Sequence, residues 1–178
     1  IGKMTNPVFF FFFQAGVNPH DNISCKESVR IIIGHVTEGI KLAERANLPK
    51  IIEDFILTHH GTGLAKYFYV KYTNDHPDED VDKNAFMYPG PNPFTREQAI
   101  LMMADTIEAA SRSLPEYTEE SIATMVEKLI EEQVSNGFFK ECPITFRDIA
   151  LAKQVGIERL MSIYHTRIQY PELKKDEK

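Results

Sequence analysis

The sequence has little that could cross-link the chain or carry it into a membrane. Its 178 residues include two cysteines and no tryptophan. Cys25 and Cys142 are far apart and lack a CxxC spacing, which argues against a disulfide framework and against a thiolate zinc site. The longest apolar run, Val8 to Phe13, has six residues, whereas a membrane-spanning helix needs about 20. Basic residues number 20 against 26 acidic ones, for a net charge of -6, so we expect no surface for a DNA or RNA polymer.

Helical patterns account for the chain from Ser24 onward. Ser24 and Glu27 have the spacing of a capping box, as do Thr95 and Gln98, and each pair precedes apolar residues that recur with the period of a helix. No alternating strand pattern competes with these helices. The expected helices cover residues 24–46, 49–59, 64–72, 95–114, 118–136 and 145–165, with a long loop over 74–93. We therefore predict a single all-α domain, a helical bundle.

The two ends of the chain carry separate expectations. The sequence begins Ile-Gly-Lys, without a methionine or a leader pattern, so we expect the domain over 1–170 to be N-terminally incomplete, a piece of a longer protein. The charged residues 171–178 are expected to fray. The run Phe9 to Phe13 suits neither an amphipathic helix nor a half-buried strand. Two interpretations remain for this run: a connector buried on all sides, or an error in its residues.

Four potential metal ligands fall at or beside helices that can converge. His35 lies inside the first long helix, His59 and His60 end the second, and Asp105 lies in the helix over 95–114. Adjacent histidines within a helix diverge by about 100°, so both reach one centre only where the helix ends, and Gly61 supplies that end. Imidazole together with carboxylate suits Mn, Fe or Zn. On spacing alone, a metal site and a set of ordinary core or surface residues are equally good interpretations.

The helix around Asp105 carries further charge on the same face. Apolar neighbours would make Asp105 costly to bury without a cation or a hydrogen-bond partner. Glu108 and Arg112 follow it by three and seven residues and form an i,i+4 ion pair. This pair is either a surface feature or a means of holding Arg112 toward a phosphate. The three histidines left aside as ordinary core or surface residues are His20, His76 and His165.

Four stretches, taken in order, resemble one known family. They are Gly34-His35-Val36, His59-His60-Gly61-Thr62, residues 86–91 (FMYPGP) and residues 103–112 (MADTIEAASR). Together they resemble the HD-domain metal phosphohydrolases, and within these the cytoplasmic domain of the seven-transmembrane HD receptors that act as bacterial cyclic di-AMP phosphodiesterases. The resemblance extends from Ile1 to about His165. It implies that the helical bundle is an HD domain.

The resemblance implies a site for two divalent metal ions, Mn²⁺ or Fe²⁺. The family builds this site from an early His, a His-Asp pair, a further His, a His-His pair and a late Asp. By resemblance, the metal ligands present in this sequence are His35, His59, His60 and Asp105. The family's His-Asp pair is followed by Ile-Gly-Lys, so the pair is expected immediately before Ile1, and without it the 178 residues alone are expected to lack a complete site.

A His-Asp dipeptide inside the chain, His20-Asp21, is the alternative to the upstream pair. Asn18-Pro19 precedes it and favours an extended, loop-like backbone. The resembling family carries a similar segment in addition to its metal pair. We therefore expect His20-Asp21 to take part in the turn before the helix at Ser24, and not in metal binding.

The reaction is likewise implied by the resemblance. Two metal ions about 3.5–4 Å apart share a bridging water and hold the phosphate for in-line attack, with the ribose 3′-oxygen as leaving group. The implied substrate is cyclic di-AMP, a small-molecule partner, and the product is pApA. Asp105 and Lys3 are the catalytic candidates, with Lys3 and Arg112 offering charge to a phosphate. Thr62 offers a hydrogen bond, and Tyr88 offers its ring or hydroxyl to an adenine.

Three other functions stay open on the sequence. One is an HD phosphohydrolase that acts on another nucleotide, which the FMYPGP and MADTIEAASR stretches disfavour. Another is a non-catalytic ligand-binding HD module, which a true lack of the His-Asp pair would require. The third is a purely structural helical domain. For the leading hypothesis, the resemblance implies a membrane-anchored parent protein with this domain on the cytoplasmic face of the bacterial membrane.

Overall fold

The computed structural model describes residues 1–11 and 19–164, and every regular element in these two ranges is a helix. Short 3-10 helices are η1 (Gly2–Thr5), η3 (Pro19–Asn22) and η4 (Lys83–Phe86). The α-helices are α1 (Pro7–Phe11), α2 (Cys25–Arg45), α3 (Lys50–Thr58), α4 (Lys66–Asp75), α5 (Arg96–Ser111), α6 (Glu119–Ser135) and α7 (Phe146–Tyr164). The predicted all-α class is confirmed. No helix within these ranges has the length and apolar content needed to cross a membrane.

The starts of the long helices are set by the predicted caps. The Ser24 hydroxyl accepts a hydrogen bond from the backbone N–H of Glu27 at 3.2 Å, and α2 begins at the next residue. Thr95 and Gln98 form a full capping box, in which each side chain accepts from the other residue's backbone N–H. These bonds satisfy backbone donors that the first turn of a helix leaves unpaired.

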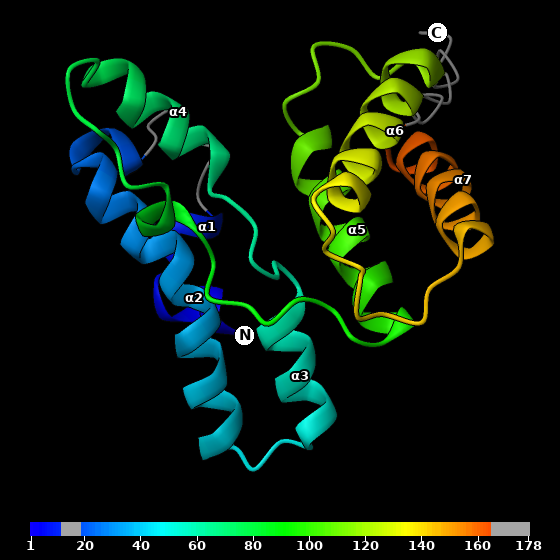
Figure 1. Cartoon of the computed structure of the whole chain (residues 1–178), viewed down its shortest axis with the longest axis horizontal. Helices are drawn as coiled ribbons and strands as arrows, with labels where there is room; N and C mark the ends of the chain where they lie inside the picture. The colour runs from blue at the N-terminus through cyan, green and yellow to red at the C-terminus, as the bar shows by residue number, and fades with distance from the viewer. Residues whose placement is uncertain (12–18, 165–178) are drawn as a thin grey trace, which may run out of the picture.

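The helices pack in two groups, which Figure 1 shows side by side. One group contains α2, α3 and α4, and the other contains α5, α6 and α7; α3 and α5 contact each other across the join. The second group holds the larger core, in which Met103, Ile122 and Leu160 are almost completely buried. The smaller core of the first group is built on Val29, Tyr72 and Phe86. Burial of these apolar side chains is the main force that holds each group together.

The segment η1 lies directly against α2 beside His35. A Cβ atom placed on Gly2 would lie 1.7 Å from the backbone oxygen of His35, and one on Gly39 would lie 3.3 Å from the backbone nitrogen of Gly2. No side chain fits between backbones that approach so closely. Glycine at both positions therefore allows η1, and Lys3 within it, to reach the side of α2 that carries His35.

Two expectations about the connecting segments are corrected. The loop over 74–93 contains η4 and an antiparallel bridge between Leu64 and Met87, and the helix expected at 64–72 begins only at Lys66, because Leu64 takes part in that bridge. Part of the phenylalanine run lies in α1, although five consecutive aromatic residues do not suit an amphipathic helix. Phe9 and Phe10 are half-buried, not buried on all sides. Phe12 and Phe13, His165 and the tail over 171–178 lie outside the described residues.

Candidate metal centre

Three histidines from two helices meet at one point. His35 comes from the middle of α2, His59 is the C-terminal cap of α3, and His60 follows it. One ring nitrogen from each can be chosen so that all three lie within 4.8 Å of one another. The backbone at Gly61 has φ 51°, a left-handed conformation that ends the helix at low cost only for glycine. The predicted convergence of the histidine pair at this helix end is therefore present.

Backbone carbonyls fix the ring orientation of two of these histidines. Nδ1 of His35 lies against the carbonyl oxygen of Ile32, and Nδ1 of His59 lies 2.8 Å from the carbonyl oxygen of Ile56. A carbonyl oxygen can only accept, so each Nδ1 must carry the hydrogen. In the neutral ring, the other nitrogen, Nε2, then presents a lone pair.

The two free lone pairs face each other. Nε2 of His35 lies 3.0 Å from Nε2 of His59. Two acceptors at this distance repel unless a cation lies between or beside them. Burial, the largest effect, lowers the pKa of His35 to about 4 and also lowers the pKa of His59, so neither ring supplies that cation as a proton near neutral pH. A metal ion would satisfy both lone pairs.

A carboxylate and an ammonium complete the near surroundings of the histidines. Asp105, on α5, has one oxygen 3.6 Å from Nδ1 of His60 and the other 4.0 Å from Nζ of Lys3. Burial lowers the pKa of His60 to about 2, with smaller contributions from His59, His35 and Lys3, so His60 is neutral. A neutral imidazole beside a carboxylate is the form that binds a divalent metal.

Tyr88 covers His60. The two rings stack with centroids 4.2 Å apart and an angle of 24° between their planes. The Leu64–Met87 bridge holds Tyr88 there, because the backbone N–H of Tyr88 donates to the carbonyl of Gly63 at 2.8 Å. Burial raises the pKa of Tyr88, so its hydroxyl keeps its proton. One face of the ring that was expected to serve an adenine is thus occupied by His60.

Thr62 is tied to the loop that carries Tyr88. Its backbone N–H and its hydroxyl both donate to Oδ1 of Asn92, at 2.8 and 3.1 Å. A Cβ atom on Gly61 would lie 2.5 Å from the same oxygen. The hydroxyl hydrogen of Thr62 is therefore already bonded to Asn92. Gly61, Thr62 and Asn92 together fix the backbone turn that follows His60.

Arg112 is the predicted site residue that the structure places apart from the cluster. It caps the C-terminal end of α5, two turns beyond Asp105, and its side chain is 66% exposed. Its Nη2 donates to Glu108 at 2.6 Å and its Nε to the same oxygen at 3.0 Å. The ion pair predicted from the spacing is confirmed, and it lies on the surface of the helix.

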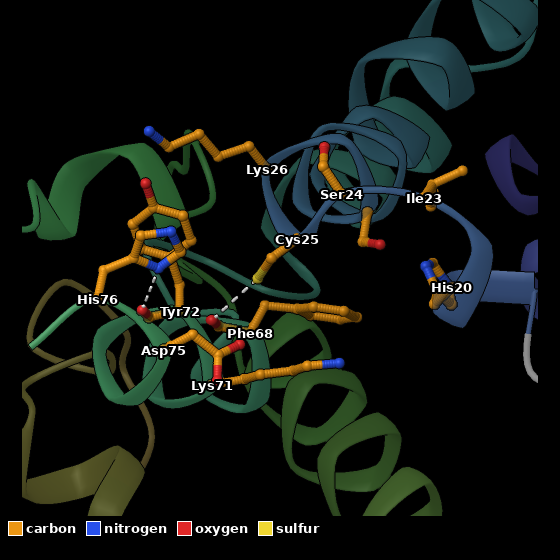
Figure 2. Close-up of a pocket in the computed structure, with 11 residues that line it drawn as sticks. His20, Ile23, Ser24, Cys25, Lys26, Phe68, Lys71, Tyr72, Asp75 and His76 are labelled. Atoms are coloured by element: carbon orange, nitrogen blue, oxygen red, sulfur yellow. Dashed lines mark hydrogen bonds between the residues drawn. The ribbon is translucent and has the colours of Figure 1, made fainter.

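His20 lies in a different environment, as expected for the alternative dipeptide. Its ring packs against Phe9 at 5.1 Å and Phe68 at 5.4 Å, between centroids, and burial lowers its pKa. Figure 2 shows His20 in the wall of a separate pocket of about 390 Å³ that Cys25 and Tyr72 also line. None of the histidines of the metal centre lines that pocket.

The residues that are brought together fit a divalent metal ion. Three neutral imidazoles and a carboxylate are donors that such ions accept, and the lone pairs of His35 and His59 face each other with no hydrogen between them. The carbonyls of Ile32 and Ile56 act as the outer partners that orient ligating histidines in metal sites. Fold and site thus define an all-α domain with a cluster of three histidines, and a nearby carboxylate, that could hold a metal ion.

Comparison with known proteins places the chain more narrowly. No protein-family model matches the sequence. The chain is 39% identical over 173 residues to the cyclic-di-AMP phosphodiesterase PgpH of Listeria monocytogenes and 36% identical over 176 residues to that of Bacillus subtilis, covering 97% and 98% of this chain. It spans about a quarter, 24%, of the length of either relative.

Solved structures give the same family. Crystal structures of the L. monocytogenes PgpH HD domain, one of them in complex with cyclic-di-AMP, superpose with TM-scores of 0.86 and 0.84 at 36% identity. The match covers 92% of this chain and 76% of each of those chains. The chain therefore belongs to the family of PgpH HD domains.

Several residues that shape the site were not predicted from the sequence. Asn92 is one, although it directly follows the FMYPGP stretch and asparagine is a common residue at such turns. Gly2 and Gly39 are two more, and only their contact in the fold reveals their role. Gln133, on α6, is the fourth; the signal available in the sequence was a glutamine at helical spacing from Ile122, Val126 and Ile130.

Proposed function

We propose that this chain is the metal-dependent HD domain of a phosphodiesterase that hydrolyses cyclic di-AMP to pApA. The observation that carries the proposal is the pair of imidazole nitrogens, Nε2 of His35 and Nε2 of His59, that face each other at 3.0 Å beside His60 and Asp105. The named activity of the PgpH relatives, and the cyclic-di-AMP bound by one of the solved HD domains, support the choice of substrate.

The proposed ligands are His35, His59, His60 and Asp105, for two divalent ions, Mn²⁺ or Fe²⁺. When bound, such ions lower the pKa of water and offset the negative charge of the phosphate. The protein's own contribution begins with orientation. The carbonyls of Ile32 and Ile56 hold two imidazoles in the tautomer whose Nε2 is free, so neither ring has to change tautomer on binding.

Lys3 and Tyr88 shape the space around the ligands. The side chain of Lys3 is 40% exposed, and its ammonium group lies 4.0 Å from Asp105, where it can attract and orient a phosphate oxygen. Tyr88 shields His60 from water on one face and keeps a hydroxyl hydrogen for donation. Hydrolysis breaks the bond from phosphorus to the ribose 3′-oxygen and forms one to the oxygen of water; one proton of the water ends on the 3′-oxygen.

Thr62 and Arg112 enter the proposal with smaller roles. The hydroxyl of Thr62 can still accept a hydrogen bond, but its hydrogen serves Asn92, so its first role is to fix the corner after His60. Two N–H groups of Arg112 donate to Glu108, so a phosphate would have to use the remaining N–H groups of the guanidinium. We further propose that the domain belongs to a membrane-anchored protein and lies on the cytoplasmic side. The support is the resemblance to the receptors and the greater length of the relatives.

The test is hydrolysis of cyclic di-AMP by the full-length gene product, with added Mn²⁺ or Fe²⁺ and with chelator. We expect pApA only with metal, and about two metal ions per chain by elemental analysis. His59→Ala should lower kcat/KM by at least 100-fold, the upper range for loss of a residue that merely orients a ligand. His76→Ala, a histidine outside the centre, is the control. If the protein prefers another nucleotide in metal-dependent hydrolysis, it is an HD phosphohydrolase of that nucleotide. If it binds cyclic di-AMP without hydrolysing it, it is a non-catalytic ligand-binding HD module.

A further inference from the structure

A pocket of about 620 Å³ begins at the metal centre and runs along α5 and α6. His60 and Tyr88 line its end at the metal centre, and Thr106, the neighbour of Asp105, lines its wall. Its size falls in the range of small-molecule sites in proteins. Anything held by the metal centre therefore has a continuous space into which a bulky substituent can extend.

One polar side chain of this pocket has its bonding arranged in an unusual way. Gln133 is 5% exposed, and its Nε2 donates to Oγ1 of Thr106 at 2.8 Å and to the carbonyl oxygen of Met102 at 3.4 Å. The Thr106 hydroxyl gives its own hydrogen to the same Met102 carbonyl, at 2.9 Å, so it can only accept from Gln133. This network fixes which end of the amide is nitrogen.

The amide oxygen of Gln133 is left as a bare acceptor. It is buried and has no hydrogen-bond partner among residues 1–11 and 19–164. A buried acceptor without a donor is unfavourable, and proteins rarely keep one without a reason. Because both hydrogens of the amide are bound to α5, the oxygen is the only group that Gln133 can offer to a molecule in the pocket.

Part of the remaining wall is apolar and suits the flat face of a purine, while Lys66, Lys83 and Glu132 line the pocket elsewhere. Met87, Met102, Leu129 and Phe138 line the pocket, and all four are half-buried or buried. The Gln133 oxygen is covered in the structure, so a ring reaches it by displacing part of this wall. Met87 is suited to that movement, because methionine is unbranched and has three rotatable bonds.

We propose that this pocket is a subsite for a 6-aminopurine and that Gln133 determines the choice of base; the inference rests on the proposed function. The exocyclic amino group of adenine donates a hydrogen to the bare oxygen. Guanine and hypoxanthine present an oxygen at the same ring position, where two acceptors would repel. The site therefore selects cyclic di-AMP against dinucleotides of 6-oxopurines.

The first test needs no mutation. The full-length protein is assayed with cyclic di-AMP and with cyclic di-IMP, which differs at this ring position by carrying an oxygen. We expect kcat/KM for cyclic di-IMP to be about 10–100-fold lower, the range for a buried polar group left unpaired. Equal use of both substrates by the metal-loaded protein would overturn the inference while leaving the phosphodiesterase in place. Failure to hydrolyse cyclic di-AMP at all would instead remove the proposed function.

The second test moves the preference by substitution. Gln133→Met keeps the length of the side chain and removes the acceptor, and the Thr106 hydroxyl keeps its bond to Met102. We expect KM for cyclic di-AMP to rise about 10-fold or more with little change in kcat, and the preference over cyclic di-IMP to collapse. Gln154→Met, the same substitution on the exposed face of α7, should change neither.

Two readouts separate recognition of the base from a merely structural role of Gln133. Metal content and hydrolysis of bis(p-nitrophenyl) phosphate, which has no purine, should be unchanged in Gln133→Met. Gln133→Glu keeps an oxygen acceptor, and it can accept from Thr106 once that hydroxyl turns its hydrogen from the Met102 carbonyl to the carboxylate, so it should retain the preference for adenine. A folded Gln133→Met protein with the parent's preference refutes the assignment, as does loss of the preference in folded Gln133→Glu.

Discussion

Replacement of His59 by glutamine should have opposite consequences with and without metal. In the parent, the lone pairs on Nε2 of His35 and of His59 face each other at 3.0 Å. In His59→Gln, an amide hydrogen can point at His35 and turn this repulsion into a hydrogen bond. With chelator present, we therefore expect the variant to be at least as stable as the parent.

The metal-loaded state reverses the order. If free Mn²⁺ is 100 times its dissociation constant, binding adds about 2.7 kcal/mol to the unfolding free energy of the parent. For a domain of this size, each kcal/mol moves Tm by about 2–4 °C, so in the full-length gene product Mn²⁺ should raise the Tm of this domain by about 5–11 °C. A 100-fold weaker site gains only about 0.4 kcal/mol at the same Mn²⁺ concentration, or about 1–2 °C.

Differential scanning calorimetry of both proteins, with chelator and across a Mn²⁺ titration, measures all four states. His76→Ala is the control, because His76 is exposed and lies outside the centre. The reasoning is wrong if His59→Gln loses several degrees in chelator and still gains as much from Mn²⁺ as the parent does. That result would mean that His59 supports packing and does not bind metal.

Three further predictions follow from single positions. Gly61→Ala should cost more than about 1 kcal/mol of stability in a urea titration and weaken metal binding, because residue 61 has φ 51° and the new Cβ would meet Asn92. The control is Gly34→Ala, in open space within α2, which should be neutral or stabilising by up to about 1 kcal/mol in the same titration. Leu160→Ala, at a buried position of α7, should lower the unfolding free energy by about 2–5 kcal/mol. Leu151→Ala, at an exposed position of the same helix, should lower it by less than about 0.5 kcal/mol, and equal losses would contradict the described core. Burial raises the pKa of the Cys142 thiol, so its thiolate fraction near pH 9 is below that of a free cysteine. Iodoacetamide should therefore label Cys142 slowly in the native protein and rapidly in guanidinium, and mass spectrometry measures both rates.

Local signals explain what the sequence could predict. Side-chain caps at Ser24 and Thr95 lie within three residues of the groups they bind, so the helix starts were accessible from spacing alone. The same holds for the histidine pair, because Gly61 marks the end of the helix in the next position. The proposed metal ligands rest on their order along the chain, through the resemblance to a family, and the structure brings His35, His59 and His60 together.

Contacts between distant segments explain what the sequence could not predict. The bond from Thr62 to Asn92 spans 30 residues and depends on how the loop over 74–93 folds back. The near contact of Gly2 with Gly39 depends on a crossing of two backbones, which no periodic pattern records. The free oxygen of Gln133 follows only from a count of hydrogen bonds in three dimensions.

The placement of the proposed metal ligands also bears on how the domain opens. His35, His59 and His60 belong to the group of α2, α3 and α4, whereas Asp105 belongs to the group of α5, α6 and α7. A metal ion bound by residues of both groups would link two hydrophobic cores that are otherwise separate. Local unfolding of either group would then require release of the ion, so amide hydrogen exchange in α2 and α5 would slow together on metal binding. The domain would behave as one cooperative unit when loaded and as two when the metal is removed.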